Sequence, residues 1–290
     1  MTIKTILAPI AGRDEDTLAL DAAFEVARRF GAHIEVLHVA GDPRDAVPFL
    51  GEGASGALIE QIMAAASRES GTRAERAKKT FESWRAAANL PVVDRPASGA
   101  GPSTTWRQES GPEDEWIGRR GRVADIVVIA RPADPNALAW TVAFEAALLE
   151  SGHPVLVMPP GSRAQQLSQG PVVIAWKPSA QSARAVAAAK PFLAGAKRVV
   201  AVTIAEGPAA AADTQELITF LAWHGIAAEG RTPELKSTSV GAVILSEAEA
   251  LGAGLVIMGA YHHNRLRQMI FGGVTRHVTA HAKLPVLLAR

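Results

Sequence analysis

Three glycines near the end of the chain stand where a phosphate could approach the backbone. The stretch GAYHHNRLRQMIFGGVTRHV runs from Gly259 to Val278, and Gly259 follows the apolar run LVIM. Gly272 and Gly273 come just before a segment with helical spacing. Glycine lets a ligand come close to the main chain, and a helix start offers free N–H groups and a partial positive charge. The spacing favours an anion site, with a tight turn as the alternative.

Neighbouring side chains add polar groups to this stretch. Thr275 offers a hydroxyl in the first turn of the expected helix, and Arg265 and Arg267 lie in the loop before it, where they can neutralise negative charge. His277 and His281 are one helical turn apart but lack the glutamate of a zinc-protease motif. We therefore predict packed or solvent-facing histidines and no metal site.

The composition excludes several kinds of chemistry. The chain has no cysteine, which excludes disulfides, thiolate metal sites and thiol catalysis. It contains no G-x-S-x-G nucleophile elbow and no Walker phosphate-binding loop. No set of residues forms a catalytic arrangement, so we predict that the protein is not an enzyme.

Length and charge point to a packed protein without a strong electrostatic field. Of 290 residues, 48% are hydrophobic and 20% charged, and 30 Lys and Arg balance 29 Asp and Glu. Such a balance does not recruit nucleic acid or an anionic membrane. The N-terminal sequence MTIKTILAPIAGRDED turns acidic after a short apolar run, unlike a signal peptide, and no apolar stretch is long enough to span a bilayer. We predict a cytoplasmic protein with no nucleic-acid or membrane partner.

The elements that must position these residues belong to a long internal repeat. Each half opens with a short apolar run, a helix-like segment and a second apolar run, and each closes with two more apolar runs. The matching runs are KTILAPI (4–10) with PVVIAW (171–176), ADIVVIA (124–130) with AGLVIMG (253–259), and HPVLVM (153–158) with LPVLLA (284–289). The repeat predicts two similar domains in tandem.

Continuous apolar runs that alternate with amphipathic helical segments are typical of a parallel sheet covered on both faces. We place the strands of the first half near 4–10, 33–39, 92–96, 125–130 and 154–158, and those of the second near 171–176, 198–204, 227–231, 254–258 and 285–289. The predicted fold is therefore α/β, with two tandem, doubly wound, mainly parallel five-stranded domains. Their bounds are 1–160 and 170–290, joined by the polar, proline-bounded linker 159–171.

One segment of the first half has no counterpart of similar length in the second half. Residues 51–89 are charged and helical in pattern, whereas the second half uses only 212–225 at that place. The additional helix can lie across a partner or cap its own domain, and the sequence leaves both open.

The glycine stretch resembles a motif of the universal stress proteins, G-x2-G-x9-G-[ST], between the fourth strand and the last helix. Gly259 and Gly272 keep the spacing, whereas His262 stands for the second glycine and Gly273 for the Ser or Thr. The resemblance extends over both halves and implies the adenine nucleotide alpha hydrolase-like fold. It also implies ATP or a related adenine nucleotide as the ligand.

The resemblance assigns further residues to the adenosine end of such a ligand. Nucleotide-binding members carry an acidic residue after the first strand, where this chain has Lys177, following Ala175. A surface lysine beside a helix cap is the favoured interpretation of Lys177. Thr203 would line the base or ribose. The full set of expected nucleotide contacts is Gly259, His262, Gly272, Gly273, Val274, Thr275, Ala175, Lys177 and Thr203.

The first half has lost the motif. Its counterpart segment 130–151 contains no glycine, and Thr141 and Val142 stand where the second half has its glycine pair. Side chains at these positions would crowd a phosphate, and Pro132 and Pro135 restrict the loop. We predict that this half binds no nucleotide in the manner of the family.

The resemblance implies a non-enzymatic, nucleotide-responsive protein of the stress response. A scaffold or interaction protein of the same fold, without nucleotide, is the alternative, and a slow nucleotide hydrolase would need a base that the sequence does not provide. Family members associate through the edge of the last strand, which predicts pairing of 154–158 with 285–289 and a homodimer.

Overall fold

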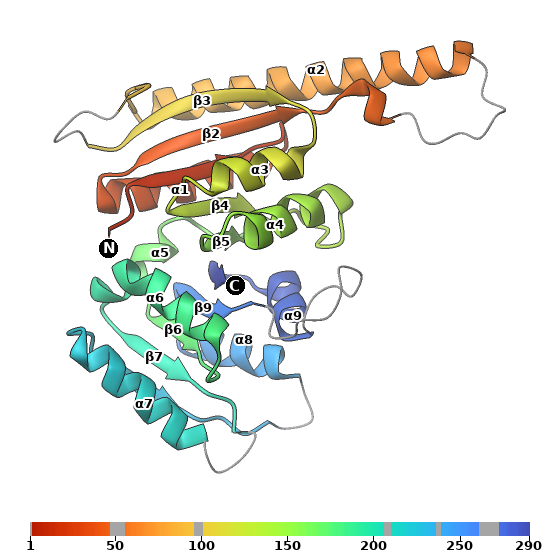
Figure 1. Cartoon of the computed structure of the whole chain (residues 1–290). Coiled ribbons are helices and arrows are strands. Elements are labelled where there is room, and N and C mark those ends of the chain that lie inside the picture. Colours follow the sequence, from red (N-terminus) through yellow and green to blue (C-terminus); the bar gives the residue numbers. More distant parts are fainter. Residues whose placement is uncertain (1, 47–55, 96–100, 206–209, 236–238, 261–272) are drawn as a thin grey trace.

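The computed structural model describes residues 2–46, 56–95, 101–205, 210–235, 239–260 and 273–290. The two halves form one continuous ten-stranded sheet, with the first half above the second in Figure 1. The strand order is β3-β2-β1-β4-β5-β10-β9-β6-β7-β8. The strands pair in parallel within each half, and only β5 and β10 pair antiparallel. The predicted α/β class with two tandem, mainly parallel domains is confirmed.

The strands follow the apolar runs closely. In the first half they are β1 (Thr5–Pro9), β2 (His33–Ala40), β3 (Ser103–Ser110), β4 (Ile126–Ala130) and β5 (Val155–Met158). In the second half they are β6 (Val172–Ala175), β7 (Val199–Val202), β8 (Glu229–Arg231), β9 (Leu255–Gly259) and β10 (Val286–Ala289).

The prediction of a strand at 92–96 was wrong. That segment makes only an isolated bridge between Val92 and Thr104, and the strand is β3, with the sequence STTWRQES. β3 is an edge strand whose residues are mostly half-buried or exposed, so it needs no continuous apolar run. A search for apolar runs therefore misses it.

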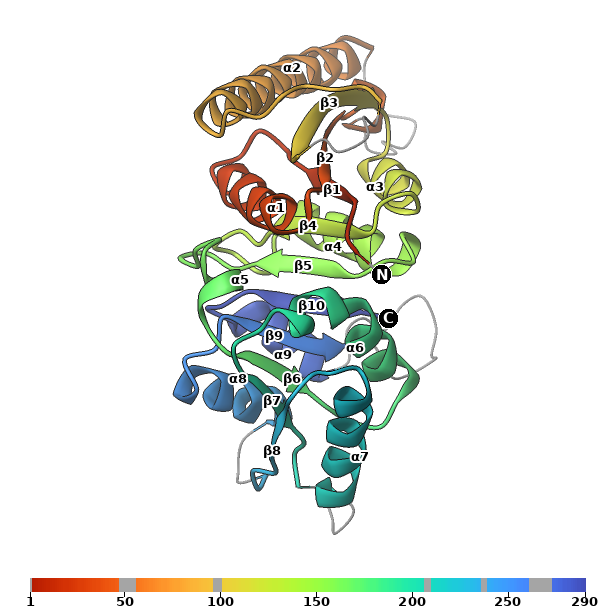
Figure 2. The same ribbon diagram turned by 90° about the vertical axis from the view of Figure 1, so that its left-hand side faces the viewer.

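Helices cover both faces of the sheet, as Figure 2 shows from the side. One core cluster lies beneath α1 (Asp16–Phe30), α2 (Gly56–Ala87), α6 (Ala180–Ala194) and α7 (Ala210–Trp223). The other lies beneath α3 (Glu113–Gly121), α4 (Leu138–Glu150), α8 (Val240–Ala250) and α9 (Gly273–His281). A short 3-10 helix, η1 (Pro43–Ala46), follows β2, and α5 (Gln166–Gln169) lies in the predicted linker.

The two halves join through their last strands, as predicted. Val157 of β5 pairs with Val286 of β10, and Leu156 pairs with Leu287. On its other side β5 pairs with β4, and β10 pairs with β9. Both strands therefore have a neighbour on each side, and neither has a free edge for a second chain to join.

The long helix α2 caps its own domain with its C-terminal half. Ala77, Phe81 and Trp84 are buried in the core cluster beneath α1 and α2. The N-terminal half is mostly exposed and continues past the end of β3 in Figure 1. For the described residues of the segment 51–89, packing on the same domain is thus the role that the structure supports.

The crossing of α2 over the β1–α1 loop depends on Gly12. This glycine has φ +73°, and a Cβ there would collide with the backbone carbonyl of Arg73 in α2. Gly31, which ends α1, has a similar φ of +61°, but a Cβ there would meet no described atom within 4 Å. Alanine substitutions at Gly12 and Gly31 therefore distinguish the energetic cost of a strained backbone from that of a steric clash.

We expect Gly31→Ala to lower the free energy of unfolding by about 1–2 kcal/mol, the cost of a left-handed alanine. Gly12→Ala should lower it by about 1–3 kcal/mol more, because the added carbon also displaces the backbone of α2. Urea denaturation of both variants measures the difference. Equal losses would mean that α2 does not pack on Gly12.

Candidate functional site

Three of the predicted site residues lie together at the carboxyl ends of neighbouring strands. Ala175 ends β6 and pairs with Val202 of β7 on one side and with Met258 of β9 on the other. Thr203 and Gly259 follow those partners directly, so all three lie at the carboxyl ends of adjacent strands. The chain leaves β6 toward β7 on one side and reaches β9 on the other. Open α/β sheets bind ligands at such a switch point.

The start of α9 is the part of this site with free backbone groups. Because α9 connects the parallel strands β9 and β10, it begins at the carboxyl edge of the sheet. Gly273 is exposed, and a side chain there would have no described atom within 4 Å. Val274 packs on the core, and Thr275 is buried (3% exposed). His262 and Gly272 lie outside the described residues, and their roles stay predictions.

Gly259 has a packing role that the sequence did not reveal. A Cβ on Gly259 would lie 2.5 Å from the backbone nitrogen of Ser182 and 2.7 Å from the carbonyl carbon of Gln181. These atoms belong to the first turn of α6, which Ser179 caps by accepting the N–H of Ser182 at 3.2 Å. The missing side chain thus lets α6 lie directly on β9, and a ligand is not needed to explain this glycine.

Two predicted contacts differ in exposure: Thr203 is buried and Lys177 is exposed. Thr203 is buried, the Thr214 hydroxyl of α7 donates to its Oγ1 at 2.7 Å, and its N–H donates to the Arg231 carbonyl at 3.0 Å. Lys177 is exposed at the same edge of the sheet. The carboxylate expected of nucleotide-binding relatives is absent, and a cation stands in its place.

The buried indole N–H of Trp176, at the same edge of the sheet, was not predicted from the sequence as a functional group. Trp176 packs on the core cluster beneath α6 and α7, and its backbone N–H donates to the Val202 carbonyl at 2.8 Å. Its indole Nε1–H is buried and has no hydrogen-bond partner among the described residues. Tryptophan can only donate through this atom, so an acceptor is needed there. Its position directly after an apolar strand was the available signal.

The corresponding crevice of the first half is nearly filled. It lies between the ends of β1 and β4, and its space amounts to about 40 Å³. Trp140 of α4 lines it, is 6% exposed, and stacks on Phe144 with ring centroids 5.2 Å apart. Ligand pockets usually measure hundreds of Å³, whereas this space holds only a few water molecules. The observation supports the prediction that this half binds no nucleotide.

The carboxylate of Asp16, in the first half, accepts hydrogen bonds from the backbone of the preceding loop. Asp16 is 5% exposed and accepts the N–H groups of Ala11, Gly12 and Arg13 at 3.2, 2.7 and 2.9 Å. Burial raises the pKa of Asp16, and these backbone hydrogen bonds oppose the shift. The turn after β1 is therefore closed by an internal acceptor. The sequence signal was an aspartate at the first residue of α1, a position where acidic residues are common.

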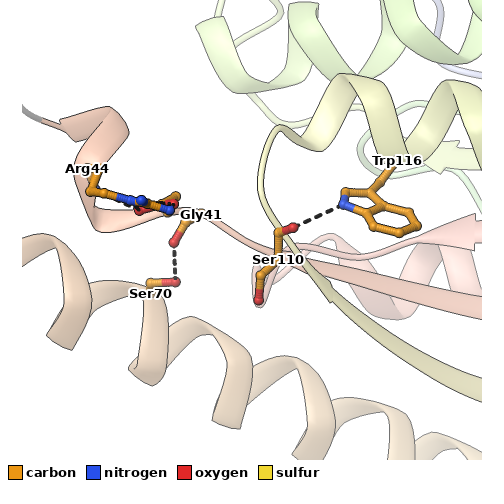
Figure 3. A network of polar contacts seen from close by, with 6 residues as sticks. Gly41, Arg44, Ser70, Ser110 and Trp116 are labelled. Carbon is orange, nitrogen blue, oxygen red and sulfur yellow. Dashed lines mark hydrogen bonds and ion pairs between the residues drawn. The ribbon is translucent and has the colours of Figure 1, made fainter.

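Figure 3 shows how the adjacent strand ends of this half are tied to helices. The Ser70 hydroxyl of α2 donates to the Gly41 carbonyl after β2 at 3.2 Å, and the Trp116 indole of α3 donates to the Ser110 carbonyl of β3 at 3.1 Å. Arg44 binds Asp42 through its guanidinium.

Burial raises the pKa of Glu113, at the start of α3, and the positive charges of nearby arginines oppose this shift. These polar groups hold the fold together at the edge of the sheet.

The described residues form neither a metal centre nor a membrane span. No group of three or more His, Asp or Glu side chains in that part of the chain is arranged to hold a metal ion. None of its helices has both the length and the apolar character that crossing a membrane requires.

Solved structures share this architecture over the whole chain. A universal stress protein from Archaeoglobus fulgidus DSM 4304 has a TM-score of 0.67 at 15% identity and covers 100% of this chain and 97% of its own. A protein of unknown function from Pseudomonas aeruginosa PAO1 has a TM-score of 0.57 at 16% identity, covering 99% and 92%. The cytoplasmic domain of a prokaryotic cation chloride cotransporter has 0.51 at 11%, covering 99% and 95%. At these identities the likeness shows the fold alone.

A comparison with curated proteins gave no match. The model of the universal stress protein family, in contrast, matches the chain twice, over residues 2–131 and 125–290. The first match covers β1 to β4, the second runs from β4 to the last residue, and together they span nearly every residue. The chain therefore belongs to the universal stress protein family, as a member with two tandem domains.

Proposed function

We propose that this protein is a non-enzymatic, cytoplasmic regulator of the stress response that holds ATP or another adenine nucleotide in its second half. The observation that carries the proposal is the exposed start of α9 at Gly273, with no described atom within 4 Å of where a side chain would point. It lies at the switch point between β6 and β9, where this fold class binds ligands.

The chemistry of this edge suits phosphate groups. The first N–H groups of α9 have no partner within the helix, and the helix dipole adds partial positive charge there. Lys177 contributes a cation at the neighbouring strand end. Thr203 and the indole N–H of Trp176 are buried near the same strand ends, on the side of α6 and α7.

The direct test is the nucleotide content of the protein as purified. We expect denaturation of the full chain to release an adenine nucleotide, identified by chromatography as ATP, ADP or AMP. Added ATP should bind to nucleotide-free protein in calorimetric titration. Protein that releases no nucleotide and gives no heat of binding would favour the second candidate.

The second candidate is a scaffold or interaction protein of the same fold without nucleotide. Two observations favour it. Gly259 is fully explained by the packing of α6 on β9, and Thr203 is already hydrogen-bonded to Thr214 and Arg231. In addition, Lys177 replaces the carboxylate that nucleotide-binding relatives carry at that turn.

We also propose that a bound nucleotide is not hydrolysed. The described residues at this edge that we expect to touch it are Ala175, Lys177, Thr203, Gly259 and Gly273 to Thr275, and they include no carboxylate or imidazole to orient water. His262, the one imidazole among the expected contacts, lies outside the described residues. Incubation with ATP should produce ADP at the rate of buffer alone. Turnover that disappears in Gly273→Val would contradict this proposal.

We also propose that the protein forms a homodimer, with an interface that does not involve the last strands. β5 and β10 are paired on both sides, so the outermost strands of the sheet are β3 and β8. β8 is a short strand, Glu229–Arg231, with all its residues exposed. Sedimentation equilibrium should show a concentration-dependent dimer, and a monomer at every concentration would remove this partner.

A further inference from the structure

A second pocket lies where the two halves meet, on the face of the sheet opposite α4 and α9. It has a volume of about 140 Å³ and is formed by α1 of the first half, α5 of the linker and α6 of the second half. Its floor consists of three buried apolar side chains, Val26, Leu167 and Phe192. A cavity of about 150 Å³ can hold a ligand as large as benzene, so the pocket suits about six non-hydrogen atoms.

Arg29 gives this apolar pocket a cation. Its Nη2 donates to the carbonyl oxygens of Phe192, at 3.0 Å, and Pro191, at 3.5 Å. The guanidinium also lies over the rings of Phe30 and Phe192, 5.2 and 5.8 Å from their centroids. A Cβ on Gly195 would collide with it, so the structure leaves room for the guanidinium at this place.

The positive charge of Arg29 has no counter-charge among the described residues. Glu25, the acid that lines the pocket, pairs with Arg28 at 2.9 Å. Within the described part of the chain, Arg29 hydrogen-bonds only through Nη2, which leaves the N–H groups of Nε and Nη1 for another acceptor. Partial burial lowers the pKa of Arg29, as expected of a cation that has lost water without gaining an anion.

We propose that this pocket binds a small monocarboxylate with a short apolar body, and that the ligand bridges the two halves of the chain. The carboxylate accepts a free N–H group of Arg29, from Nη1 or from Nε, and the apolar body covers Val26, Leu167 and Phe192. Inorganic phosphate fits less well, because it has no apolar part to cover that floor. A neutral molecule of the same shape would leave the cation without a partner.

The test uses the isotope-labelled full chain and titrations followed by NMR. The probes are butyrate, which has six non-hydrogen atoms, and its neutral amide, butyramide. We expect butyrate to shift the backbone amide signals of Val26, Leu167 and Phe192 saturably. Butyramide should bind about tenfold more weakly or worse, because its neutral carbonyl cannot form the ion pair that a carboxylate forms with Arg29.

Two variants and a control separate the pocket from general effects. Arg29→Met should abolish the preference for butyrate over butyramide. Ser168→Trp should abolish binding of both, because Ser168 is an exposed residue of the rim and an indole there covers the opening while Arg29 stays in place. Lys283→Met removes one exposed charge at the turn before β10 and should change neither titration.

Three results would overturn the proposal. Absence of saturable shifts with butyrate in the wild type would exclude the site, and equal binding of butyrate and butyramide would show an apolar pocket that does not recognise anions. Unchanged butyrate binding in Ser168→Trp would place the ligand elsewhere. None of these outcomes depends on nucleotide binding, because the pocket and the start of α9 lie on opposite faces of the sheet.

Discussion

Gly273→Val is expected to lower the affinity for ATP by at least about tenfold while the protein stays folded. If the phosphates lie against the N–H groups at the start of α9, a branched side chain at Gly273 blocks their approach. Loss of one or two charge-assisted hydrogen bonds, each about 1.5–3 kcal/mol, corresponds to that factor. The fold should tolerate the change, because no described atom lies within 4 Å of the new Cβ.

The matched control is Val142→Ile in the first half. Val142 stands at the position of Gly273 in the repeat and lies on α4, beside the nearly filled crevice. Because the described crevice of that half measures only about 40 Å³, the affinity for ATP should be unchanged. Calorimetric titration of the wild type and both variants measures the effect. A folded Gly273→Val with wild-type affinity would place the phosphates somewhere else.

Gly259→Ala is expected to lower the free energy of unfolding by about 2–3 kcal/mol, the upper part of the range for overpacked cores. The new carbon would lie 2.5 Å from the Ser182 nitrogen, and α6 cannot move away without leaving β9. Backbone atoms cannot change rotamer, so the strain has no easy release. Urea denaturation followed by circular dichroism measures the loss.

Gly273→Ala provides the comparison within the same motif. No described atom lies within 4 Å of its Cβ position, and alanine favours the helix over glycine, so stability should be unchanged or rise by up to about 1 kcal/mol. The two glycines of one sequence pattern thus have different predicted roles. If both substitutions cost the same, the packing of α6 on Gly259 would not be the reason for that glycine.

The architecture could be predicted from the sequence because its signals are local. The runs IVVIA and LVIMG are apolar on both faces, which is expected only of strands covered by helices on each side. Their repetition in the two halves predicted the tandem arrangement, and the family resemblance predicted the pairing of the last strands, where Val157 meets Val286. β3 escaped the prediction because its edge position removes the need for such a run.

The roles of individual residues were decided by contacts between segments far apart in the chain. The pattern around Gly259 indicated a position without a side chain, but the Ser182 backbone that lies against it comes from a distant helix and became known only from the packing. The repeat likewise indicated a helix after the first strand, but only the structure shows that the Asp16 carboxylate accepts three N–H groups of the preceding loop. Periodicity and propensity act over a few neighbouring residues, and they fix the strands, the helices and their order. Which atoms fill the space beside a glycine or satisfy a buried charge depends on how those elements pack.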